Sequence, residues 1–155
     1  MMKKFFATLL AVLLLLSLTA CKDKTPPLAV EAGDVYTNYS AVHIAKVTPV
    51  AEDGQIALTL QIQNDSEYLV TYGESFQILR QEGDGWVDLE LPEGYGFMEI
   101  AHLLEAGKTA EQTYDVTFYY GVDGPGTYRL KTQGHADEPE KSIRFQLWAD
   151  FTVTQ

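Results

Sequence analysis

The chain has 155 residues, of which 11 are basic and 22 are acidic, so its formal net charge is −11. Such an excess of carboxylates repels nucleic acid and anionic lipid headgroups, and we therefore expect no nucleic-acid partner. A single cysteine is present, so no disulfide can form within the chain. The length suits one ordinary domain, which is large enough to fold around its own core without disulfides or metals.

The first 20 residues carry the pattern of an export signal. Lys3 and Lys4 provide a positive start, residues 5–16 form an apolar run, and residues 17–20 are mostly small. The apolar run is shorter than the roughly 20 residues that a membrane-spanning helix needs, and a polar stretch follows it. The pattern predicts a cleaved signal peptide over residues 1–20.

The sequence Leu18-Thr19-Ala20-Cys21 resembles the lipobox of bacterial lipoproteins, in which the cysteine is acylated and becomes the new N-terminus. The resemblance implies lipid attachment at Cys21 and a location at the extracytoplasmic face of the cell membrane. A plain secretory peptide is the alternative, but it would leave Cys21 as an unpaired thiol in an exported protein. The mature chain would keep nine basic and 22 acidic residues, a formal charge of −13. The lipid must then supply the membrane contact, for which the diacylated cysteine that the resemblance implies is sufficient.

Residues 22–40 predict a flexible tether, because they contain Pro26-Pro27, Gly33 and several charges and show no sustained apolar period. We expect this tether to hold the domain clear of the bilayer. The predicted organisation is a signal peptide over 1–20, a lipidated cysteine and flexible tether over 21–40, and one domain over 41–155.

From Ala41 onward, apolar and polar residues alternate with the period of half-buried strands. The clearest case is residues 55–63, where four aliphatic side chains share one face. A preceding strand through Val42 and Ile44 is expected to stop at Pro49, with a turn over 51–54.

The same signals predict the rest of the chain. They indicate strands over 75–80 and 86–91 around a hairpin loop at 81–85, a strand over 97–104, a strand over 109–119, a turn over 121–126, a strand over 128–131, an acidic loop over 135–140 and a final strand through 143–153. For 97–104 a short helical turn is the alternative. About seven to nine short strands predict an all-β fold of two packed antiparallel sheets, as a sandwich or a barrel.

Two segments resemble the bacterial immunoglobulin-like domain of exported Gram-positive proteins. The first is an Asn-rich turn at Asn64-Asp65-Ser66 that leads into Tyr72-Gly73, with Gly85-Trp86 after a hairpin. The second is Gly124-Pro125-Gly126-Thr127-Tyr128-Arg129, at the start of a late strand. The resemblance covers about 41–153 and implies an Ig-like antiparallel β-sandwich. Two departures are Val122-Asp123, where a leucine is expected, and the length of 92–104.

The resemblance implies structural roles for two aromatic residues. Tyr128, just after a tight turn, is placed to return its hydroxyl to the upstream backbone as a tyrosine corner. Trp86 is expected to pack its ring over the sheet, with its indole N–H reaching a carbonyl.

The sequence offers little chemistry for catalysis or for metal binding. His43, His102 and His135 fall in separate segments without the spacing of zinc ligands. The acidic clusters at 82–84 and 137–140 lack the alternating ligand spacing of a dedicated calcium loop. We therefore expect no catalytic residue, no metal and no cofactor.

Nine tyrosines suggest a binding surface. Tyr119 and Tyr120 are adjacent, so one ring must face outward if the strand reaches them, and they are the predicted partner-binding residues. The alternative is that the tyrosines only fill strand positions.

These features favour a non-enzymatic binding or accessory module with an envelope protein or glycan as partner. A small-ligand carrier or sensor is the alternative, and it needs a pocket between the sheets. A cell-envelope hydrolase would need a pair of carboxylates in a cleft.

Overall fold

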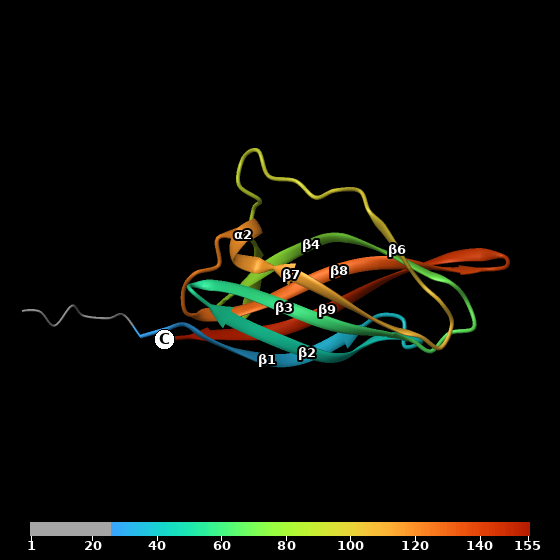
Figure 1. Cartoon of the computed structure of the whole chain (residues 1–155), viewed down its shortest axis with the longest axis horizontal. Coiled ribbons are helices and arrows are strands. Elements are labelled where there is room, and N and C mark those ends of the chain that lie inside the picture. The colour runs from blue at the N-terminus through green and yellow to red at the C-terminus, as the bar shows by residue number, and fades with distance from the viewer. Residues whose placement is uncertain (1–25) are drawn as a thin grey trace, which may run out of the picture.

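The computed structural model describes residues 26–155, and in this part of the chain two antiparallel sheets pack face to face (Figure 1). The larger sheet has the strand order β1-β9-β8-β4-β5, with β6 also paired to β4. Its strands are β1 (Ala29–Thr37), β4 (Val70–Glu82), β5 (Gly85–Asp88), β6 (Ala101–Leu104), β8 (Gly126–Glu138) and β9 (Lys141–Thr154). The smaller sheet, in the order β2-β3-β7, contains β2 (Val42–Glu52), β3 (Gln55–Asn64) and β7 (Thr109–Asp115). The expected all-β sandwich is confirmed. The predicted signal peptide and Cys21 lie outside the described residues.

The core lies between the two sheets and follows directly from the alternation of the strands. Every second residue of β3, from Ile56 to Ile62, is fully buried, as the sequence pattern predicts. From the opposite sheet, β9 contributes Phe145, Leu147 and Phe151, which are also fully buried. Each such side chain contributes about 1.5–3 kcal/mol when it leaves water, which explains how a domain without disulfides holds together.

Residues 29–37 form strand β1, so the prediction of a flexible tether over 21–40 is wrong for this part. Strand β1 pairs with β9 from Ala29↔Thr154 to Thr37↔Leu147. The register shifts between Ala32 and Val35, and this irregularity interrupts the apolar period that would otherwise reveal a strand. Most of β1 is also exposed, because it is an edge strand.

Strand β2 continues through Pro49, where a stop was expected. Pro49 is paired with Leu58 of β3, and β2 is an edge strand of its sheet. An edge strand tolerates proline because the missing N–H can be on the side that has no partner. The turn itself is confined to Asp53-Gly54, both with positive φ (49° and 77°), as a tight two-residue hairpin requires.

The strand expected over 109–119 ends at Asp115, and residues Val116–Tyr120 form the short helix α2. The Asp115 side chain caps this helix by accepting a hydrogen bond from the Phe118 N–H at 2.9 Å. Gly121 ends it in the left-handed conformation (φ 63°). A capping aspartate and a terminal glycine, with only five residues between them, override the alternation pattern.

Two further segments differ from expectation at their ends. Of 97–104, only Ala101–Leu104 is a strand. The acidic loop expected over 135–140 is mostly strand, because β8 extends to Glu138 and β9 begins at Lys141. The β8–β9 hairpin reaches beyond the rest of the sandwich (Figure 1). The charged residues at the tip of this hairpin can be part of strands because their side chains remain in water.

Candidate functional site

The solvent side of the larger sheet carries an unusual set of side chains. Residues of β8 and β9 alternate between the core and this side, so the positions next to the buried ones project away from the smaller sheet. Four cross-strand pairs lie there in succession: Arg129↔Asp150, Lys131↔Trp148, Gln133↔Gln146 and His135↔Arg144. We define the outer face as these eight residues together with Tyr36 of β1, Gln77 of β4 and Trp86 of β5.

Arg129 organises one end of the outer face. Its Nε and Nη2 atoms donate to the two carboxylate oxygens of Asp150 at 2.6 and 2.8 Å. This bidentate hydrogen bonding raises the pKa of Arg129 above its already high usual value. The guanidinium carbon lies 4.1 Å from the ring centre of Trp86 and 5.2 Å from that of Tyr36. Two aromatic rings are therefore held in place by one cation.

Tyr36 and Trp148 extend this cluster across two strands. They are direct cross-strand partners of β1 and β9, and with Arg129 they line a hollow of about 230 Å³. Tyr36 is 45% exposed, whereas Trp148 is half-buried. Two aromatic rings and a guanidinium that is hydrogen-bonded to Asp150 therefore line this hollow.

Two more hollows lie along the larger sheet. One of about 190 Å³ is lined in part by Gln77, Lys131 and Gln133. The other, of about 400 Å³, is lined in part by His135 and Arg144. Both border the irregularity of β4 between residues 72 and 76, where its pairing with β8 is interrupted.

Two cations of the outer face have no carboxylate partner, as is also true of Lys46, Arg80 and Lys108 elsewhere in residues 26–155. Within residues 26–155, neither Lys131 nor Arg144 has a carboxylate within 4.0 Å. Arg129, in contrast, is neutralised by Asp150. Lys131 lies next to Trp148 in the register of the sheet, so a free positive charge adjoins an aromatic ring.

The predicted partner-binding tyrosines lie elsewhere. Tyr119 and Tyr120 belong to helix α2, and both rings pack edge-on against Phe76 of the core. The Tyr120 hydroxyl donates to the Phe76 carbonyl oxygen at 2.6 Å, and burial raises the pKa of Tyr120 to about 12. The Tyr119 ring also stacks on Phe97 at 4.5 Å. Both side chains are half-buried, and the structure does not bring them onto the outer face.

The two aromatic residues expected to be structural have different surroundings. The Tyr128 hydroxyl donates to the Gly124 carbonyl oxygen at 3.1 Å, the bond that the tyrosine-corner hypothesis expects. Trp86 packs over the sheet, but its face meets the Arg129 guanidinium, and its indole N–H finds no carbonyl within residues 26–155. Trp86 is thus part of the outer face.

Sequence reasoning missed Tyr36, Arg129 and Trp148. A tryptophan out of phase with the buried residues of an amphipathic strand is a usable signal, and Trp148 directly follows the buried Leu147. Arg129 is likewise out of phase with Tyr128 and Leu130. Tyr36 was missed because residues 22–40 were expected to form a flexible tether and not a strand.

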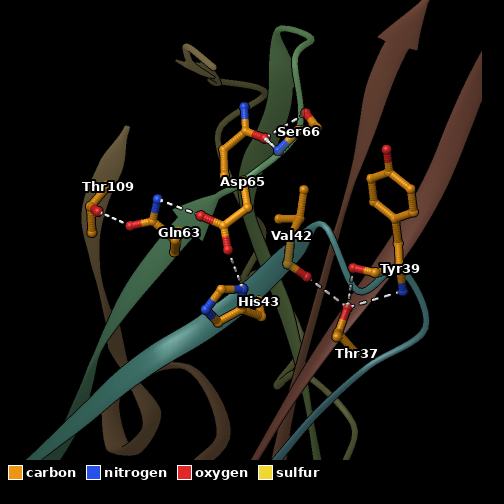
Figure 2. A network of polar contacts seen from close by, with 9 residues as sticks. Thr37, Tyr39, Val42, His43, Gln63, Asp65, Ser66 and Thr109 are labelled. Atoms are coloured by element: carbon orange, nitrogen blue, oxygen red, sulfur yellow. Dashed lines mark hydrogen bonds and ion pairs between the residues drawn. The ribbon is translucent and has the colours of Figure 1, made fainter. Parts of the chain in front are cut away.

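The remaining polar residues are mostly used for structure. Figure 2 shows such a network, in which His43 Nδ1 lies 3.5 Å from Asp65 and Gln63 donates to the same carboxylate. In the same network, the Thr37 hydroxyl donates to the Val42 carbonyl oxygen at 2.8 Å and so ties the end of β1 to the start of β2. The polar groups of this network are therefore engaged with one another.

The structure shows neither a metal cluster nor a membrane span within residues 26–155. No group of three or more potential metal-ligating side chains comes together there. His102 and His135 each face a single carboxylate, Glu74 at 3.3 Å and Asp137 at 3.7 Å. In the same part of the chain, no helix has the length and apolar character needed to cross a membrane.

Among the comparisons with known proteins, a family model supports this architecture. The family model of the bacterial Ig-like domain matches residues 38–146. The crystal structure of a protein from Archaeoglobus fulgidus is similar with a TM-score of 0.34 and 8% identity, covering 81% of this chain and 98% of that chain. A search of curated proteins found no match. Because the family model spans most of the two-sheet sandwich, the chain belongs to the bacterial Ig-like domain family.

Proposed function

We propose that this protein is a membrane-anchored extracytoplasmic lipoprotein whose Ig-like domain is a non-enzymatic binding module, and that the outer face binds its partner. The observation that carries the proposal is the cluster of Tyr36, Trp86 and Trp148 around Arg129. Tryptophan, tyrosine and arginine are the side chains that contribute most to binding hot spots. Here they meet on a solvated sheet surface and are fixed before any partner arrives.

Preorganisation is what makes this cluster suited to binding. Ordering a flexible side chain at an interface costs about 0.5–1.5 kcal/mol. The bidentate bond from Arg129 to Asp150 and the contacts of the guanidinium with the Trp86 and Tyr36 rings already restrict these side chains in the free protein. Much of that cost is therefore avoided when a partner binds.

Membrane anchoring has a direct test at Cys21. In a detergent phase-separation experiment on whole-cell extracts, we expect the wild-type protein in the detergent phase and Cys21→Ala that has lost residues 1–20 in the aqueous phase, because the lipid is what makes the mature chain amphiphilic. Thr25→Ala, which keeps the thiol, is the control. A Cys21→Ala protein that has lost residues 1–20 and still stays in the detergent phase contradicts the lipoprotein hypothesis.

Binding through the outer face is tested with the full chain, purified in a mild detergent and mixed with washed envelope fragments of the bacterium that produces it. We expect sedimentation with the fragments, and a loss of about tenfold in affinity for Tyr36→Ala, since truncation of a hot-spot residue costs more than about 1.4 kcal/mol. Tyr95→Ala is a matched control, because Tyr95 is also 45% exposed but lies outside the outer face.

Either of two results contradicts the binding role. One is a wild-type chain that does not sediment with the fragments at all. The other is equal retention of wild type, Tyr36→Ala and a second variant, Trp148→Ala, with near-native circular dichroism in all three. A carrier of small ligands remains the alternative, but the buried hydrophobic side chains of the core are at most 6% exposed.

A further inference from the structure

We infer that the outer face binds a polysaccharide whose pyranose rings carry carboxylate groups, an inference that rests on the binding role proposed above. The face combines two properties that such a polymer needs together. It has flat aromatic surfaces for ring faces, and it has unpaired cations beside them for carboxylates. Different residues of the outer face supply the two properties.

The aromatic contribution comes from Tyr36 and Trp148. These two side chains are cross-strand neighbours, and together with Arg129 they line the hollow of about 230 Å³. A wide aromatic ring offers apolar area with few rotatable bonds, which suits the flat face of a sugar ring. The neighbouring ring of Trp86 is covered on one side by the guanidinium, so we assign ring stacking to Tyr36 and Trp148.

The cationic contribution comes from Lys131 and Arg144. Within residues 26–155, neither forms an ion pair. The linings of the three hollows include Arg129, Lys131 and Arg144 but only one carboxylate, that of Glu99. The whole chain has twice as many acidic as basic residues, so the linings of these hollows have the opposite charge balance to the chain.

The arrangement of these groups matches a repeating polymer. Lys131 and Trp148 are lateral neighbours on adjacent strands, roughly 5 Å apart along the hydrogen-bonding direction. Four outward positions of β8, from Arg129 to His135, span roughly 20 Å of extended strand. Between the rings and Arg144 lie the amides of Gln133 and Gln146, which can hydrogen-bond to sugar hydroxyls. Rings, amides and cations thus follow one another along the face.

Other anionic occupants fit less well. A polyol phosphate has negative charge but lacks a ring face for Tyr36 and Trp148 to stack against. An anionic bilayer would meet the excess negative charge of the whole domain, whereas a single strand of polymer can remain on the cationic strip. A neutral glycan would leave Lys131 and Arg144 without partners. The guanidinium fork of Arg144 is particularly suited to a carboxylate.

The experiment compares three soluble polymers with the full chain in a mild detergent, by titration calorimetry at low and at moderate salt. Polygalacturonate supplies rings and carboxylates, its carboxyl-reduced form supplies rings alone, and polyphosphate supplies charge alone. We expect polygalacturonate to bind at least roughly tenfold more tightly than either of the others, with an affinity that falls as salt is raised.

Variants locate the site within the same experiment. We expect Trp148→Ala and the double variant Lys131→Gln/Arg144→Gln each to lose about tenfold in affinity for polygalacturonate. Tyr95→Ala and Lys46→Gln are the matched controls, because they remove an exposed ring and an exposed cation outside the outer face. Thermal unfolding of every variant shows whether a loss reflects misfolding, and Tyr36→Phe provides a conservative ring variant that should keep its affinity.

The outcomes separate this inference from the proposed function. Equal binding of the carboxyl-reduced polymer or of polyphosphate overturns it, as does undiminished binding by the folded Trp148→Ala and double variants. If polygalacturonate does not bind but envelope fragments are still retained through Tyr36, the carboxylated-glycan inference is wrong and the binding module stands. If neither binds, both are wrong.

Discussion

Asn64 shows how much a single buried residue contributes to this fold. It is fully buried, and its amide nitrogen donates to the carbonyl oxygens of Tyr68, Leu104 and Glu105. Its side-chain oxygen accepts from both the N–H and the hydroxyl of Ser66. One amide therefore holds the turn after β3 against a segment 40 residues further along the chain.

At this scale we expect Asn64→Ala to lower the free energy of unfolding by about 2–4 kcal/mol, because it leaves several buried polar groups without partners. Gln63→Ala is the control, since its hydrogen bonds with Asp65 and Thr109 are exposed. That change should cost less than about 1 kcal/mol. Urea unfolding measures both values, and similar losses for the two variants would contradict this account of Asn64.

The sequence indicates part of the role of Asn64. An Asn-rich turn is a feature of the resemblance to Ig-like domains, and asparagine is a common turn residue because its side chain bonds to the nearby backbone. The contacts to Leu104 and Glu105 were not predictable, because they depend on how the β6 region folds back on the turn. Local chemistry is visible in a sequence, whereas the distant partners are not.

Among the elements, β8 is positioned by the absence of a side chain at Gly134. A methyl group there would lie 2.5 Å from the Thr71 carbonyl oxygen and 2.6 Å from the Phe145 ring. Strand β8 pairs with β4 on one side and β9 on the other. The small residue allows the three strands and a core ring to meet next to the irregularity of β4.

We therefore expect Gly134→Ala to lower the free energy of unfolding by about 2–4 kcal/mol, because backbone and a packed ring must both move. Gly96→Ala is the matched control, since nothing lies within 4 Å of its added methyl group. It should stay within about 1 kcal/mol of wild type. Denaturant unfolding distinguishes the two, and a Gly134→Ala protein of wild-type stability would refute this explanation of the close approach.

The elements also show where alternation is a sufficient guide. Strand β3 was predicted almost to its ends, because its alternation is regular and one face is wholly buried. Strand β1 and helix α2 were not predicted. In β1 the exposed edge position weakens the pattern, and in α2 the helix is so short that its Asp115 cap and terminal Gly121 decide the structure.

For the molecule as a whole, one buried and one half-buried tyrosine lower the free energy of unfolding at alkaline pH. Burial raises the pKa of Tyr114 to about 12 and that of Tyr120 to about 12, from an ordinary value of 10.0. Above pH 10 the unfolded chain releases these protons while the folded protein retains them. The free energy of unfolding should therefore be independent of these two groups below pH 10 and fall as pH rises from 10 to 12.

Urea unfolding at several pH values measures this dependence. Tyr114→Phe removes one of the two groups and keeps the ring, so its free energy of unfolding should fall less steeply between pH 10 and 12 than that of wild type. The hydroxyl lies 3.4 Å from that of Thr132, and its loss should cost about 1 kcal/mol at neutral pH. Identical slopes for wild type and variant would show that Tyr114 titrates normally in the folded state.

The sequence alone specifies the two-sheet β architecture, because period-two alternation indicates which side of a strand is buried whatever its neighbours are. It also determined the tyrosine corner at Tyr128, whose bond to Gly124 spans only four residues. The composition of the outer face, in contrast, depends on the tertiary structure. Tyr36, Trp86 and Trp148 come from the beginning, middle and end of the chain, and the strand order of the larger sheet brings them to Arg129. Strand order depends on pairing between strands that are distant in the sequence, and the local pattern of one strand does not indicate its partners.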